Sequence, residues 1–320
     1  MNAGSALRQM APLLGGLLSR LPGVNAALGR HARDPSMISG RYCYGVWLKH
    51  LTLAWPHGME KIPDCVVEIG PGSSLGTGVA ALLCGATRYA ALDVVRSART
   101  QATRKVFPEI LGLLQERSGR PTRGWPDYDA LLDARLFPSH ILTEPQLQAS
   151  LHPDRVKMVG EAIAQLGGAD QHPALRYGTW RDAPPLEDGQ ADFAFSHVVM
   201  DEVADLDAVY GCCARLLRSG GWMSHQIDFS SLGLTPEWNG HLRYDEQHWR
   251  LISGKRHYFV NRERCSGHVA RILRQGFDIV AVDRCQRFNG IHRSELAPRW
   301  RDIPNEDLNC SAAFIVARKR

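Results

Sequence analysis

The segment 66–95 constrains the fold of this chain more than any other part of the sequence. It reads VVEIGPGSSLGTGVAALLCGATRYAALDVV, which predicts a buried strand, a glycine turn, a helix and a second strand. Glycine at positions 70 and 72 permits a tight turn against which a ligand can lie. Because acidic residues end both strands at what would be one edge of a parallel sheet, we expect a ligand site there.

The spacing of the glycines discriminates between two kinds of cofactor. A dinucleotide fingerprint has a third glycine three residues after the second, where this chain has Leu75. Glu68 is also a poor neighbour for a pyrophosphate and a good one for a cationic ligand. These residues disfavour an NAD(P)-dependent Rossmann oxidoreductase, which stays one of the alternatives.

The residues Glu68-Ile69-Gly70-Pro71-Gly72, followed by Asp93, resemble the first motif of the class I S-adenosylmethionine-dependent methyltransferases. A second stretch, 191–229, is similar to the central strand, loop, helix and strand of that family. The resemblance covers roughly residues 62–95 and 174–318, and it implies S-adenosyl-L-methionine as the cofactor. The cofactor-binding residues it implies are Glu68, Gly70, Pro71, Gly72, Ser73, Asp93, Val94, Trp180, Asp182, Ser196 and His197.

The same resemblance implies a Rossmann-like α/β fold: a mostly parallel seven-stranded sheet with an antiparallel last strand and helices on both faces. We expect residues 1–60 to form an N-terminal helical segment and residues 61–320 the methyltransferase domain. About residues 96–172 would be an insertion after the second strand, for which we favour a lid near the binding edge, with a solvated decoration of the surface as the alternative. The expected strands are 66–69, 89–93, 174–178, 192–199, 222–229, 277–283 and 311–317.

Leucines recur at helical spacing near the N-terminus. The stripe comprises Leu7, Met10, Leu14, Leu17, Leu18 and Leu21. The favoured interpretation is a helix packed on the domain through this stripe, and the alternative is a helix lying on a membrane surface. A second helix is expected within 39–55, where Tyr42, Tyr44 and His50 would either face the cofactor pocket or cover the sheet.

A histidine at the end of the fourth strand suggests general-base catalysis. His197 is our first candidate for a general base, because imidazole accepts protons near neutral pH. His225 and Asp228 on the fifth strand form a second set, although strand alternation sends them to opposite faces. The segment lacks the Asn/Asp-Pro-Pro-aromatic motif of enzymes that methylate amino groups of nucleic-acid bases, which disfavours that activity.

Composition indicates which partners and which cellular compartment to expect for the protein. The net charge of +5 is spread along the chain and does not indicate a nucleic-acid partner. Eight scattered cysteines without a C-x-x-C pair suggest reduced thiols in the cytoplasm, and the histidine spacings match no metal site. We expect a cytoplasmic protein, with peripheral contact at the inner face of the membrane through the N-terminal helix as the alternative.

We therefore expect an S-adenosylmethionine-dependent methyltransferase that methylates a small-molecule, glycan or lipid-linked hydroxyl group with a histidine general base. Besides the oxidoreductase, the alternative is a non-catalytic methyltransferase-like partner subunit, against which the intact Glu68, Gly70, Gly72 and Asp93 argue. The sequence leaves the acceptor and the oligomeric state open.

Overall fold

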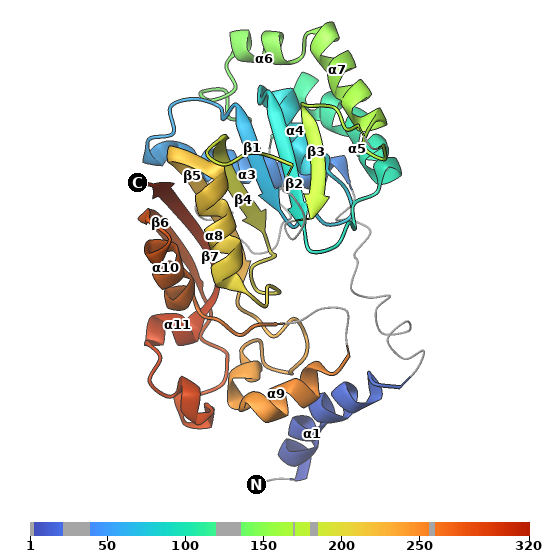
Figure 1. Ribbon diagram of the computed structural model, residues 1–320. Coiled ribbons are helices and arrows are strands. Elements are labelled where there is room, and N and C mark those ends of the chain that lie inside the picture. The colour runs from blue at the N-terminus through green and yellow to red at the C-terminus, as the bar shows by residue number, and fades with distance from the viewer. Residues whose placement is uncertain (1–2, 22–38, 120–135, 169, 180–184, 256–259) are drawn as a thin grey trace.

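The fold is described from a computed structural model, which covers residues 3–21, 39–119, 136–168, 170–179, 185–255 and 260–320 (Figure 1). Trp180 and Asp182, the two residues expected near the adenine, lie outside these ranges. All eight cysteines lie within them; none forms a disulfide, and all but Cys285 are buried.

A seven-stranded sheet in the order β3-β2-β1-β4-β5-β7-β6 forms the centre of the molecule. Strands β1 to β5 pair in parallel, whereas β7 runs antiparallel to both of its neighbours. This arrangement confirms the expected fold class. The strands are Cys65–Ile69 (β1), Arg88–Asp93 (β2), Leu175–Thr179 (β3), Ala191–His197 (β4), Leu217–Asp228 (β5), Phe277–Gln286 (β6) and Cys310–Lys319 (β7).

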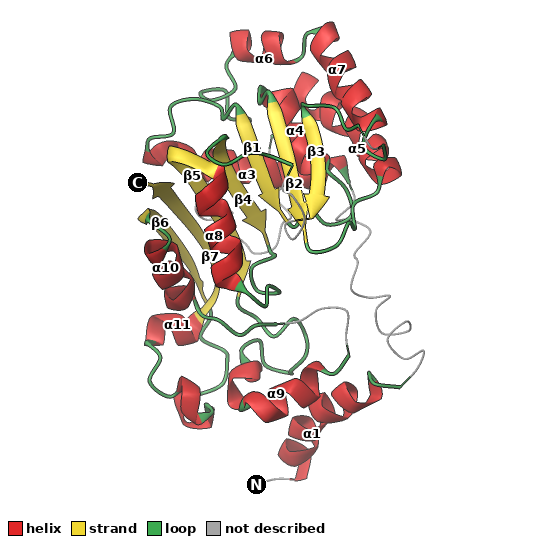
Figure 2. Ribbon diagram, in the orientation of Figure 1, coloured by secondary structure: helices red, strands yellow, loops and turns green. Residues whose placement is uncertain are grey.

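Helices cover both faces of this sheet (Figure 2). Alternation along β4 sends Phe193 and Phe195 to one face, where both rings contact Trp47, and Ala194 to the other. All five residues of β1 are buried, as expected for a central parallel strand. The first face is covered by α3 (Gly40–Ala54), α4 (Gly76–Cys84) and α5 (Thr100–Gln115), and the second by α8 (Leu206–Leu216) and α10 (Cys265–Arg274).

Helix α3 is part of the core of the domain. Its N-cap residue Ser39 accepts a hydrogen bond from the backbone N–H of Tyr42, which satisfies one donor of the first turn. The backbone N–H of Gly40 donates to Glu109 Oε2 of α5 at 2.6 Å. The helix therefore packs on the sheet and on its neighbours, and it brings Tyr42 and His50 toward the end of β4.

The insertion between β2 and β3 does not lie where we expected it. It contains α5, α6 (Glu144–Ser150) and α7 (Pro153–Ala164). In Figure 1 α6 and α7 lie at the top, at the amino ends of the strands, whereas the arrowheads point away from them. The interpretation of these two helices as a lid over the binding edge is therefore wrong, and residues 120–135 lie outside the described part.

Contacts with the end of α4 explain this position. The guanidinium of Arg155 donates to the carbonyl oxygen of Leu82 at 3.0 Å and to that of Ala86, and Gln146 Nε2 donates to the carbonyl oxygen of Cys84 at 3.3 Å. The last carbonyls of a helix lack partners within the helix, so α6 and α7 satisfy them.

Residues that follow β5 and β6 form a layer beyond the carboxyl edge of the sheet (Figure 1). The buried Arg262 holds this layer together: it donates to the carbonyl oxygen of Tyr244 at 2.6 Å and to Glu246 Oε2 at 2.7 Å, and it lies over the Trp249 ring. The layer contains α9 (Glu246–Ser253), α11 (Asn305–Asn309) and three short 3-10 helices, and α1 (Ala3–Leu18) packs against α9.

Candidate cofactor and catalytic site

The glycine turn after β1 combines one crowded position with one open position. Both Gly70 and Gly72 have φ of +70°, a conformation that side chains other than glycine rarely adopt. A Cβ atom at Gly70 would lie 2.6 Å from Val199 Cγ1, whereas a Cβ atom at Gly72 would meet no atom within 4 Å. Gly70 is therefore required for packing, and Gly72 leaves its backbone accessible to a ligand.

Asp93 is joined to this turn by a residue that we did not expect. The Ser97 hydroxyl lies 2.6 Å from Asp93 Oδ2 and 3.1 Å from the carbonyl oxygen of Gly72, and it can donate to either. Asp93 Oδ1 accepts from the backbone N–H of Val94 at 2.8 Å. Tyr177 fixes the segment, because its hydroxyl accepts from the backbone N–H of Ser97. Neither Ser97 nor Tyr177 belongs to a sequence motif. They meet only because β3, which carries Tyr177, pairs with β2, which ends shortly before Ser97.

Glu68 lies beneath the turn and is only 4% exposed. It accepts a short hydrogen bond from the Tyr89 hydroxyl, which favours its ionised form. Burial outweighs that bond and, helped by the nearby Asp93, raises the pKa of Glu68 to about 8. A cation bound at the turn would lower this pKa, as expected for a site that receives a positively charged ligand.

The register of β1 and β4 places His197 beside the glycine turn. Ile69 pairs with Ser196, so the next residue on each strand, Gly70 and His197, lie side by side at the carboxyl edge. His197 Nδ1 lies 3.2 Å from His50 Nε2, and His50 Nδ1 lies 2.5 Å from Ser224 Oγ. Burial lowers the pKa of both histidines well below the usual value.

The hydrogen-bonded series of His197, His50 and Ser224 couples the tautomers of the two imidazole rings. When both imidazoles are neutral, His197 Nδ1 carries a proton only if His50 Nε2 accepts it and His50 Nδ1 donates to Ser224. In that tautomer His197 Nε2 has a lone pair and can act as a base. The Tyr42 ring, whose centroid lies 6.1 Å from that of the His197 ring at an interplanar angle of 80°, bounds the imidazole on another side.

Ser196 and His225 lie on the opposite face of the sheet from His197. Ser196 Oγ is 2.7 Å from His225 Nδ1, and the His225 ring packs edge-on against Tyr210 of α8. Burial lowers the pKa of His225 to about 3. These surroundings are those of a core residue, so the structure does not bring the side chains of Ser196 and His225 together with the glycine turn.

The remaining expected residues lie near the same edge. Pro71 and Ser73 belong to the glycine turn, and Val94 is about half exposed beside Asp93. Asp228 ends β5, where its carboxylate accepts from the backbone N–H and the hydroxyl of Ser230 at 2.8 and 3.1 Å. The cofactor and catalytic roles of all these residues stay predictions.

Asp201 is a buried carboxyl group in the loop after β4. It is 3% exposed, and neither side-chain oxygen has a hydrogen-bond partner among the described residues. Burial, with help from Asp228 and Glu202, raises the pKa of Asp201 well above the usual value. Its backbone carbonyl accepts from the backbone N–H of Asn261 at 2.8 Å, which ties the loop after β4 to the layer beyond the edge.

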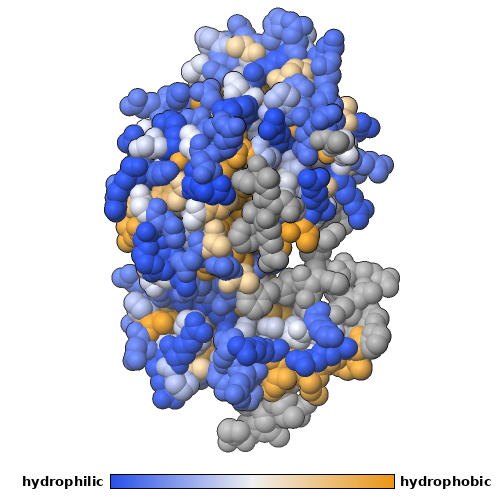
Figure 3. All heavy atoms as spheres, in the orientation of Figure 1, coloured by the Kyte–Doolittle hydropathy of each residue, from blue (hydrophilic) through white to orange (hydrophobic). Residues whose placement is uncertain are grey.

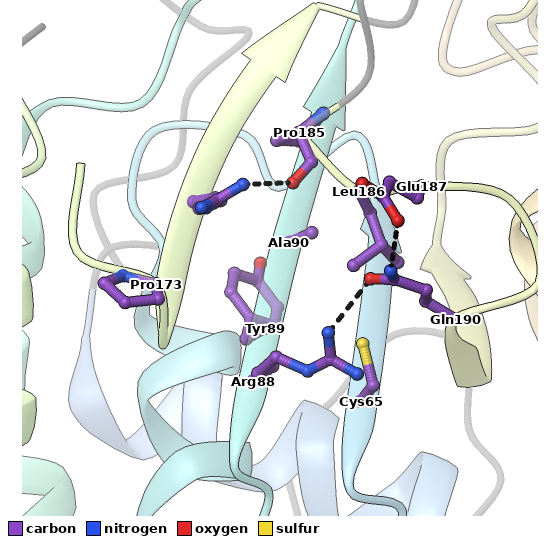
Figure 4. Close-up of a pocket in the computed structure, with 10 residues that line it drawn as sticks. Cys65, Arg88, Tyr89, Ala90, Pro173, Pro185, Leu186, Glu187 and Gln190 are labelled. Atoms are coloured by element: carbon purple, nitrogen blue, oxygen red, sulfur yellow. Dashed lines mark hydrogen bonds between the residues drawn. The ribbon is translucent and has the colours of Figure 1, made fainter. Parts of the chain in front are cut away.

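A cavity of about 220 Å³ lies elsewhere, at the amino ends of β1 and β2 (Figure 4). Cys65 and Arg88, the first residues of these strands, line it together with Pro185 and Gln190. Arg88 donates to Gln190 Oε1 at 2.9 Å, so its guanidinium is already engaged. The cavity is thus separate from the glycine turn and contains none of the expected site residues.

A family model described as a methyltransferase domain matches residues 154–224, which include β3, β4 and α8. No curated protein matches the sequence.

Several solved structures are similar to the chain at low sequence identity. An S-adenosylmethionine-dependent methyltransferase from Listeria monocytogenes is 13% identical over 88% of this chain and all of its own, with a TM-score of 0.41. A methyltransferase in complex with the Trm112 activator from Haloferax volcanii is 14% identical over 84% of this chain and 87% of its own, with a TM-score of 0.40. Geranyl diphosphate C-methyltransferase from Streptomyces coelicolor is 10% identical over 85% of this chain and 79% of its own, with a TM-score of 0.43.

Proposed function

We propose that this chain is a class I S-adenosylmethionine-dependent methyltransferase that methylates a hydroxyl group and uses His197 as the general base. The observation that carries the proposal is the position of His197: its backbone lies beside Gly70 in the strand register, and its Nδ1 lies 3.2 Å from His50 Nε2. Burial lowers the pKa of His197, so the imidazole is neutral at physiological pH and keeps a lone pair for a proton, although the lower pKa makes it a weaker base than a free imidazole.

The residues at the edge divide into those that would hold the cofactor and those that would act on the acceptor. Asp93, oriented by Ser97, would accept hydrogen bonds from the ribose hydroxyls, and the backbone of the turn from Gly70 to Ser73 would lie along the methionyl part. When bound, S-adenosylmethionine supplies an electrophilic methyl group. His197 would take the proton of the acceptor hydroxyl at Nε2 as the oxygen receives that methyl group.

For the acceptor we propose a small-molecule, glycan or lipid-linked hydroxyl compound. The strand end Ser196-His197-Val198-Val199 lacks the motif that serves amino groups of nucleic-acid bases. The Asp201 carboxyl in the neighbouring loop has no hydrogen-bond partner among the described residues, and it offers a group that can accept a hydrogen bond from a polar acceptor. A polar, hydroxylated molecule fits these groups better than an apolar one does.

Calorimetry with S-adenosylhomocysteine tests the cofactor site. We expect Asp93→Asn to weaken binding by about tenfold or more, because hydrogen bonds to a charged carboxylate are lost. The control is Asp278→Asn, since Asp278 is exposed at the amino end of β6. Equal affinities of the two variants would contradict the assignment of Asp93.

Methyl incorporation tests the acceptor and the base. Labelled S-adenosylmethionine would be incubated with the protein and with small-molecule, glycan, lipid and nucleic-acid fractions of a cell lysate. We expect label in one of the first three fractions and its loss in His197→Ala, but not in His152→Ala, an exposed histidine before α7. Full turnover by His197→Ala would overturn the role of the base, and label confined to nucleic acid would overturn the acceptor class.

A further inference from the structure

The N-terminal helix α1 docks on the protein with the face that we did not expect. Pro12, Gly16 and Ser19 are buried against α9, at positions that recur at helical spacing. The Ser19 hydroxyl donates to the carbonyl oxygen of Gly16 at 2.6 Å and accepts from the backbone N–H of Lys255 at 3.0 Å. Small residues thus allow close contact between the backbones of α1 and α9. For residues 11–21, the expectation that the leucine stripe packs on the domain is therefore wrong.

The leucine stripe instead faces outward. Leu14, Leu17, Leu18 and Leu21 are each 50–54% exposed, and Leu251 of α9 beside them is 38% exposed. Figure 3 shows apolar side chains gathered at the lower end of the molecule, over α1. Leu7 and Met10 belong to the same stripe in the sequence, but their side chains lie outside the described part. A row of exposed leucines on one helix is an apolar surface of the kind that a partner covers.

The charged residues near the leucine stripe indicate which kind of partner would cover it. The first 33 residues contain four arginines and no aspartate or glutamate; the first acidic residue is Asp34. In the described part, Arg20 follows α1 next to the stripe, and Arg250 adjoins Leu251 on α9; the Arg250 side chain is 75% exposed and forms an exposed ion pair with Glu246 at 3.5 Å. Leucines bordered by arginines are the pattern of helices that lie in the interface of an anionic bilayer.

We propose that α1 and the adjoining end of α9 form a docking surface for an anionic lipid bilayer, in which Leu14, Leu17, Leu18 and Leu21 insert into the interface. None of the described helices is long and apolar enough to cross a membrane, so the contact would be peripheral. A second copy of the chain is a poorer occupant, because a symmetric contact would bring the arginines of both copies together. The proposal does not depend on the identity of the methyl acceptor.

Binding to vesicles tests the proposal with the full chain. Vesicles of phosphatidylglycerol and phosphatidylcholine in equal parts would be compared with vesicles of phosphatidylcholine alone. We expect co-sedimentation with the anionic vesicles, weakened by added salt, and a loss of about tenfold or more in affinity for the double variant Leu17→Ser/Leu18→Ser. The control is Leu273→Ser, since Leu273 is 42% exposed on α10, away from α1.

Three outcomes would overturn the proposal. One is equal vesicle binding by the double variant and the control, and another is no binding of the wild-type chain to anionic vesicles. The third is a concentration-dependent dimer, measured by light scattering, that the double variant abolishes; this would assign the stripe to a second copy. Because both leucines are half exposed, the variant should melt at the wild-type temperature, which distinguishes lost docking from unfolding.

Discussion

Glu68 connects the stability of the protein with its ligand. Its carboxyl group titrates near 4.5 in an unfolded chain and near 8 in the folded protein, so the folded state holds an extra proton between these pH values. The contribution of Glu68 to the free energy of unfolding should therefore fall as the pH rises from about 4.5 to 8. At pH 8 and without ligand, Glu68→Gln should be more stable than the wild type by an amount on the order of a few kcal/mol.

The same substitution should weaken binding of S-adenosylmethionine, because an amide cannot supply negative charge to a cationic ligand. Urea unfolding at pH 5 and pH 8 checks the stability, and calorimetry checks the affinity. Glu60→Gln, at an exposed position, serves as the control. If Glu68→Gln and the wild type kept the same dependence on pH, the protonated state assigned to Glu68 would be wrong.

Among the elements, α1 depends on one glycine, Gly16, for its docking on α9. A Cβ atom at Gly16 would lie 1.9 Å from the backbone carbonyl oxygen of Leu251, which a side chain cannot displace without moving α1 or α9. We expect Gly16→Val to release α1 from α9 and to speed proteolysis near the N-terminus, while the melting temperature of the sheet domain changes little. In the control, Gly112→Ala in α5, the added Cβ meets no atom within 4 Å, so α1 should stay docked.

Strand positions were predictable from the sequence, whereas the docking of peripheral helices was not. Apolar runs such as Val66–Ile69 determine burial locally, and the observed strands agree with the expected ones to within a few residues. The face of α1 that docks depends on backbone contact at Gly16, which hydrophobic periodicity does not report. Likewise, the position of α7 depends on the bond of Arg155 to the end of α4, a contact between residues far apart in the sequence.

The candidate site was predictable to a similar degree. Gly70, Gly72 and Asp93 form a motif, and the register of β1 with β2 and β4 places them beside His197. Ser97 and Tyr177 carry no local signal, because each reaches the site only through tertiary contacts. His50 belongs to a helix that was expected either to face the pocket or to cover the sheet, and only the tertiary structure gives its contact with His197. Motif residues are therefore visible in one sequence, and the residues that orient them are not.

The whole molecule should lose stability in acid because of its buried histidines. Burial lowers the pKa of His225 and His268 to about 3, and it lowers those of His50, His197 and His241 well below the usual value. An unfolded chain protonates all five near pH 6.5, so the free energy of unfolding should fall as the pH drops below that value. The five histidines outweigh the opposite effect of Glu68 and Asp201 in this range.

Denaturant unfolding at pH 6.5 and pH 5 checks this expectation. Each histidine contributes up to about 1.4 kcal/mol per pH unit to the slope. His268→Gln, which keeps a partner for the Tyr210 hydroxyl, should reduce the slope, whereas the exposed His248→Gln should leave it unchanged. A stability that does not depend on pH between 5 and 6.5 would contradict the neutral state of these rings.

The position of β7 in the sheet also constrains how the chain can assemble. β6 is an edge strand whose neighbour is β7, yet β7 follows β6 in the chain. During synthesis β6 therefore leaves the ribosome before the strand that links it to β5 exists. Until β7 inserts between them, β5 presents an open edge, so the half of the sheet from β3 to β5 can form first and β6 joins only at the last step.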